Sequence, residues 1–76
     1  MTAPKYIQAK AKQLHNAMNL VAQLAGEIEE WVGKHDGVDG SDFFYENKLD
    51  MVYEYDLGTT LRNLDLVESG EYESWS

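Results

Sequence analysis

The chain has 76 residues, of which 43% are hydrophobic and 26% charged, and its net charge is −8 at pH 7. This length allows one hydrophobic core, so we expect a single small helical domain over residues 1–76. The absence of cysteine excludes disulfides and thiolate zinc sites and favours a cytoplasmic location. Neither a signal-peptide core nor a run of about 20 apolar residues that could span a membrane is present in the sequence.

Charge is divided unevenly along the chain. The charged side chains before Glu27 are Lys5, Lys10 and Lys12, which give this part +3. From Glu27 onward three cations accompany all fourteen acids, which leaves −11. Such a segment repels nucleic acid and anionic membranes, because binding either one requires cations. We therefore expect no direct binding to nucleic acid or membrane.

The first expected element is a long amphipathic helix. Thr2 or Ala3 can cap its start, and Gly33 suits the position after its last turn. Its apolar side chains recur at seven-residue intervals in three rows. The rows are Ile7, Leu14, Val21 and Ile28; Ala11, Met18, Ala25 and Val32; and Ala17, Leu24 and Trp31. A stripe of this breadth is typical of a bundle helix, so another element must cover it.

The stretch HDGVDGSD at residues 35–42 follows this helix. An EF-hand calcium loop that began at Asp36 would need an oxygen ligand at its fifth position, glycine at its sixth and glutamate at its twelfth. Gly40, Ser41 and Asn47 stand there instead. Glycines suit positive φ angles and aspartates suit helix caps, so we predict a turn and expect neither a metal nor a cofactor.

A second helix is expected from Ser41 or Asp42, packed antiparallel on the first. The predicted fold class is therefore an all-α helical hairpin. Gly58 interrupts the pattern and Thr59 or Thr60 can cap a further segment, so we predict a break near Gly58 and two to three helices. The side predicted to face the first helix carries Tyr45, Leu49, Val52 and Tyr53.

Two segments near the C-terminus depart from a simple helical pattern. Apolar and polar side chains alternate over residues 50–57, which also fits a strand. No other segment alternates equally, and an isolated strand cannot satisfy its backbone groups, so we prefer the helix. Residues 69–76 are expected to form a flexible acidic tail.

The predicted second helix carries two further surfaces. The acidic surface consists of Asp36, Asp39, Asp42, Glu46, Asp50 and Glu54. Its last three members form a ridge with carboxylates about 6 Å apart, roughly the spacing of phosphates. The apolar surface consists of Phe44, Met51 and Tyr55. Since two helices cannot bury two apolar faces, this second surface predicts a homodimer or a foreign partner.

Two classes of function follow from these surfaces. The first is a small acidic, non-enzymatic binding protein that inhibits or modulates a larger protein by occupying its basic, nucleic-acid-binding groove in place of phosphates. Its composition is similar to that of phage-encoded inhibitors of host or defence proteins, which act in the host cytoplasm. The second is a homo-oligomeric helical assembly or scaffolding protein, whose acids serve only solubility.

An enzyme is the third alternative, because acids on facing helices could present four carboxylates to magnesium. Five acids are candidates for these four positions: Glu27 and Glu30 in the first helix and Glu46, Asp50 and Glu54 in the second. An E-x-x-E helix followed by an acidic helix resembles helical nucleotide pyrophosphohydrolases of the MazG type, and the resemblance implies magnesium-dependent hydrolysis. The E-x-x-D pair of that family is missing here. His15 and His35 have no adjacent serine and acid, so we expect both to be solvated and predict no catalytic residue.

Overall fold

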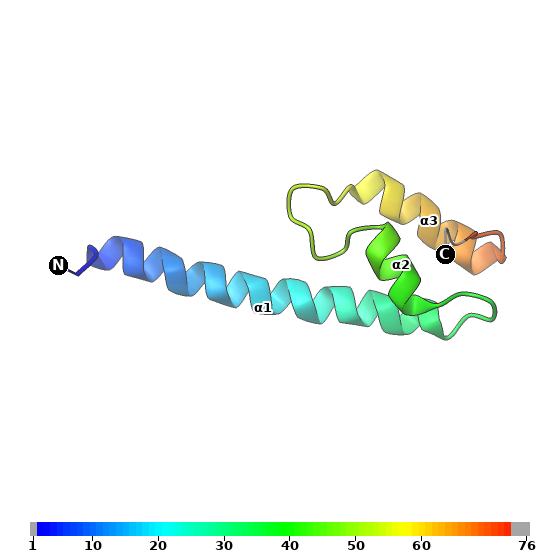
Figure 1. Cartoon of the computed structure of the whole chain (residues 1–76), viewed down its shortest axis with the longest axis horizontal. Helices are drawn as coiled ribbons and strands as arrows, with labels where there is room; N and C mark the ends of the chain where they lie inside the picture. The colour runs from blue at the N-terminus through cyan, green and yellow to red at the C-terminus, as the bar shows by residue number, and fades with distance from the viewer. Residues whose placement is uncertain (1, 74–76) are drawn as a thin grey trace.

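The computed structural model describes residues 2–73, and in that part of the chain it contains three helices and no strand (Figure 1). Helix α1 spans Lys5–Gly33, α2 spans Gly40–Glu46 and α3 spans Leu57–Ser69. The all-α fold class is thus confirmed. None of the described helices combines the length and the apolar character needed to cross a membrane.

Helix α1 projects far beyond the rest of the fold. Its N-terminal half extends alone in Figure 1, while α2, α3 and the segment between them gather at its C-terminal end. The molecule measures 55 × 19 × 19 Å. Its radius of gyration is 16.1 Å, against about 11 Å for a compact chain of this length. We refer to residues 5–20 as the arm and to residues 21–73 as the head.

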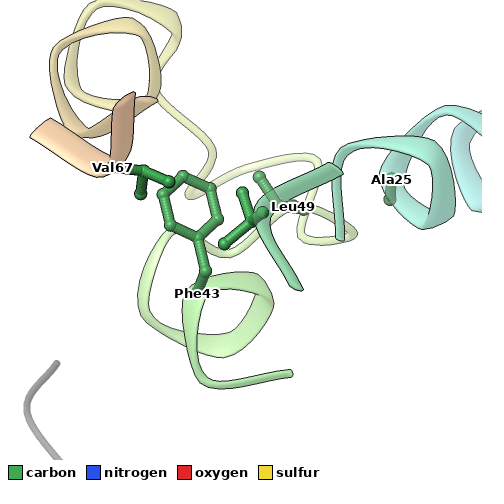
Figure 2. Close-up of a cluster of buried hydrophobic side chains, with 5 residues drawn as sticks. Ala25, Phe43, Leu49 and Val67 are labelled. Carbon is green, nitrogen blue, oxygen red and sulfur yellow. The ribbon is translucent and has the colours of Figure 1, made fainter. Parts of the chain in front are cut away.

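The hydrophobic core lies in the head and is small. Phe43 and Val32 are fully buried and Val67 nearly so, with Leu49 and Ala25 beside them. Figure 2 shows the Phe43 ring of α2 with Val67 of α3 on one side and Leu49 on the other. Burial of each larger side chain stabilises the fold by about 1.5–3 kcal/mol, so these few residues hold the three helices together.

The turn between α1 and α2, at residues 34–39, brings α2 into close contact with α1. Gly37 supplies a positive φ of 82°, and the Asp39 side chain caps α2 by accepting a hydrogen bond from the Ser41 amide at 2.8 Å. Gly40 packs so close to α1 that a Cβ atom there would overlap the carbonyl oxygen of Glu29. The predicted turn is therefore confirmed, and its second glycine serves close helix packing.

The second helix ends at Glu46 and α3 begins at Leu57. The predicted interruption is therefore present but lies at residues 47–56, before Gly58, and the predicted two to three helices are three in the described residues. The Asn47 side chain donates to the Phe43 carbonyl at 3.0 Å, and Lys48 adopts a left-handed φ of 52°, which stops the helix. Residues 47–56 form turns, neither the helix nor the strand considered for them. Gly58 lies inside the first turn of α3, which Asp56 caps by accepting from the Thr59 amide at 2.8 Å.

The early end of α2 also changes which side chains face α1. Leu49 reaches the core as predicted, with 7% of its surface exposed. Tyr45, Val52 and Tyr53 are 78%, 75% and 100% exposed, so their predicted place against α1 is wrong. These residues share a face only in a continuous helix, and the turns after Glu46 remove that face.

A polar cluster joins the end of α2 to α3 and to the segment beyond it. The Asn63 side chain donates to Asn47 Oδ1 at 2.6 Å, and the Tyr72 hydroxyl donates to Glu46 Oε2 at 2.6 Å. The Tyr72 ring also packs on Phe43, with ring centroids 5.2 Å apart. Within the predicted flexible tail, Tyr72 is thus held against the core, and residues 74–76 lie outside the described residues.

Replacement of Gly40 by alanine tests the close contact between α1 and α2. Since the added methyl group would overlap the Glu29 backbone, we expect Gly40→Ala to lower the free energy of unfolding by about 1–3 kcal/mol. Gly26→Ala is the matched control, because nothing lies within 4 Å of its Cβ position and alanine favours a helix by about 1 kcal/mol. Urea denaturation measures both. Equal stability of the two variants would contradict the close approach.

The pH dependence of stability tests the Tyr72 contact. Burial, together with the hydrogen bond to the Glu46 carboxylate, raises the pKa of Tyr72 well above its ordinary value of about 10. The folded state therefore holds this proton more tightly, so its stabilisation is complete below pH 10 and is lost as the pH rises above that value.

Urea denaturation of the unmodified chain at increasing pH should show this alkaline loss, and Tyr72→Phe should lack that part of it. Tyr53→Phe, which alters a fully exposed ring, should behave like the unmodified chain. An identical alkaline slope in Tyr72→Phe would contradict the contact.

Candidate protein-binding surface

The apolar stripe of α1 is covered in the head and bare in the arm. Ala25 and Val32 are 3% and 0% exposed beneath the head. Ile7, Leu14 and Met18 belong to the same apolar stripe but are 44%, 56% and 59% exposed. Because this spacing keeps residues on one face of a helix, the head covers only the C-terminal half of a continuous apolar face.

The exposed area of the whole chain is large for its mass. It amounts to 6181 Å² at 8.7 kDa. A compact protein of this mass exposes about 4,700 Å², which leaves an excess of about 1,400 Å². A standard interface buries about 800 Å² on each partner, so the excess is sufficient for one.

An open apolar groove lies where the arm meets the head. Its volume is about 390 Å³, and α1 and the turns at residues 47–56 form its two walls. The lining includes Val21, Leu24 and Ile28 of α1 and Leu49, Met51 and Tyr55 of the turns. The one acid among the lining residues is Asp50. The groove can therefore receive an apolar side chain and offers a carboxylate to a neighbouring cation.

A second hollow adjoins this groove through Leu24 and Ile28, which line both. It is completed by Trp31 and by Leu64 of α3, with Glu27 also in its lining. Trp31 is 40% exposed. Apolar surface therefore continues around α1 from the arm onto the head.

The structure brings together only part of the predicted apolar surface. Met51 and Tyr55 both line the groove and are 47% and 38% exposed. Phe44 instead packs partly buried against the core. The other wall of the groove comes from α1, which was not predicted, although the third row of the α1 stripe, which includes Leu24, was a signal for it.

The predicted acidic ridge does not form, because α2 ends at its first member, Glu46. That carboxylate accepts the hydrogen bond of Tyr72, and Glu54 Oε1 lies 3.6 Å from Lys48 Nζ. Asp39 serves as the cap of α2. Asp36 and Asp50 are exposed and Asp42 is half-buried, so the acidic surface is dispersed over the turn, α2 and the segment after it.

The acids that resembled a magnesium site also remain apart. Within residues 2–73, no three side chains of histidine, aspartate or glutamate lie close enough to hold a metal ion together. The E-x-x-E pair of Glu27 and Glu30 therefore finds no matching pair on a facing helix.

His35 links two helices. Its Nδ1 lies 3.0 Å from the Trp31 carbonyl oxygen and its Nε2 lies 3.2 Å from Glu68 Oε2, so the half-buried ring joins α1 to α3. The expectation that this histidine is simply solvated is therefore wrong. His15 is exposed on the arm, with Nε2 at 3.3 Å from the Asn19 side chain.

Comparison of the chain with protein-family models, with curated proteins and with solved structures found no match. Function is therefore inferred from the residues of this chain alone.

Proposed function

We propose that this chain is a non-enzymatic helical assembly protein, which associates with copies of itself through the apolar face of α1. The observation that carries the proposal is the arm, whose stripe residues Ile7, Leu14 and Met18 continue the rows that pack in the core yet lie exposed. Large contiguous apolar patches are rare on monomers and mark interaction sites. Heptad rows are the pattern by which one helix packs against another.

Two further properties support self-association. The excess of exposed area matches what an interface needs, and the core of the head is small for a domain that folds alone. Pairing of two arms would bury apolar side chains at about 25 cal/mol per Å² and so add to the stability that the core supplies.

The second candidate is the acidic binding protein that occupies a basic groove of a larger protein. The charge of the head favours it, since all fourteen acids lie between Glu27 and Glu73. Exposed Asp36 and Asp50 would then meet the cations of the partner. Binding to a basic groove should be lost in Asp36→Lys. Assembly through the arm should be weakened by Leu14→Lys and left unchanged by Asp36→Lys.

Two leucines of α1 provide a matched test of the assembly. Leu14 lies near the middle of the stripe, and Leu20 lies about 120° away around the helix at the edge of the third row; they are 56% and 53% exposed. Loss of a buried leucine costs about 1.5–3 kcal/mol, so Leu14→Glu should raise the dissociation constant at least tenfold, at about 1.4 kcal/mol per decade. Leu20→Glu, at the edge of the face, should raise it clearly less.

Light scattering after gel filtration measures the masses, and circular dichroism verifies the fold of each variant. Neither leucine belongs to the core cluster, so the head should remain folded in both variants. A monomeric unmodified chain at high concentration, or equal effects of the two substitutions, would contradict the proposal.

A further inference from the structure

We propose that two copies pair antiparallel, so that the first turn of α1 in each copy, with Tyr6 and Ile7, occupies the groove of the other. This inference rests on the self-association proposed above and adds its geometry. Tyr6 is 67% exposed and Ile7 44% exposed at the free end of the arm. The groove between α1 and the turns at residues 47–56 is apolar and open.

Charge decides the direction of pairing. The arm carries +3, from Lys5, Lys10 and Lys12, while the head carries −11. Parallel pairing would set two heads of the same charge side by side. Antiparallel pairing lays each basic arm along the acidic head of the other copy, within the Debye length of about 8 Å at physiological salt. A second copy is therefore the occupant that complements this chain in both charge and apolar pattern.

One register satisfies the apolar rows and the charges together. When two such stripes run antiparallel, residues of one row face residues of the other. If Leu14 faces Met18 of the second copy, then Ala11 faces Val21 and Ile7 comes level with Ala25. Val21 and Ala25 both line the groove, so the arm ends where the groove opens.

The same register brings the first lysine of the arm level with an acid. Lys5 comes level with Glu27, whose side chain lines the neighbouring hollow. Asp50 lies in the groove lining itself, within reach of a lysine side chain that accompanies the first turn. The arm is about 24 Å long at 1.5 Å per residue. In this register residues 12–20 of the two copies pair with each other, and the first turn of each arm reaches the groove of the other copy.

Tyrosines of the turns offer a matched pair of variants for the groove. Tyr55 lines the groove and Tyr53 is fully exposed outside its lining. Tyr55→Ala should weaken the dimer about tenfold or more, whereas Tyr53→Ala should leave it unchanged. Tyr6→Ala, which alters the arm without touching the core cluster, should weaken the dimer in the same way. Equal dimer affinity of Tyr6→Ala and the unmodified chain would overturn insertion of the first turn.

Distances between spin labels test the direction of pairing. The chain has no cysteine, so one labelled cysteine can be introduced at a chosen position. Asn16 and Glu30 are exposed positions on α1, the first near the centre of the pairing and the second at its far end. In the antiparallel dimer, labels on Asn16→Cys should lie within about 20 Å of each other, since paired helix axes are about 10 Å apart. Labels on Glu30→Cys should lie about 40 Å apart at 1.5 Å rise per residue.

Each outcome of the distance measurement has one meaning. A short distance for Asn16→Cys with a distance of about 40 Å for Glu30→Cys supports the antiparallel dimer. Short distances for both indicate parallel pairing, which overturns this inference and leaves the assembly function standing. No distance for either means a monomer, and both proposals then fail.

The salt dependence of the dimer affinity provides an independent test of the direction of pairing. Screening should weaken the antiparallel dimer, because it removes attraction between arm and head. Screening would instead strengthen a parallel dimer, in which like-charged heads repel. A dimer that tightens as salt is added would therefore overturn the antiparallel arrangement.

Discussion

The incomplete cover of α1 is the constraint on which the rest of the molecule depends. The helix carries one continuous apolar face over its 29 residues, but α2 packs against its C-terminal half alone, and α3 and the turns between them gather at that same end. The core is therefore confined to one end, around Phe43 and Val32. The elongated shape, the exposed arm and the open groove all follow from this mismatch of length.

The charges and caps of α1 do little to stabilise the helix by themselves, so the stability of the arm depends on tertiary contacts. Pro4 provides no side-chain cap, the first turn of α1 has no acid and its last turn has no base. Lysines near the start and glutamates near the end oppose the helix macrodipole, at about 0.3–1 kcal/mol for each exposed charge near a terminus. Short helices without tertiary contacts are marginal in water.

The same charges become favourable between two helices that run in opposite directions. In the register proposed above, Lys5 of one arm comes level with Glu27 of the other α1, so a charge order that weakens a single helix would favour a pair. This gives a physical reason for the order of charges along the chain. It also relates the charges of the arm to the direction in which the two copies of the proposed dimer run.

The long first helix and its stripe were predictable from sequence because both depend on periodicity within one segment. The end of α2 was not, since it depends on the side chain of Asn47 and on the left-handed backbone of Lys48, which leave no periodic trace. The acidic ridge failed with it, because its geometry required a continuous helix. Docking of Tyr72 on Phe43 joins residues far apart in sequence, and local patterns carry no signal for such contacts.

Hydrogen exchange of the arm amides tests the central claim most directly. Exchange would be followed residue by residue at low and at high protein concentration. If the bare face of α1 pairs with a second copy, amides of residues 5–20 should become protected as concentration rises, while amides around Phe43 stay protected throughout. Rapid exchange of the arm at every concentration, with a protected head, would contradict the account.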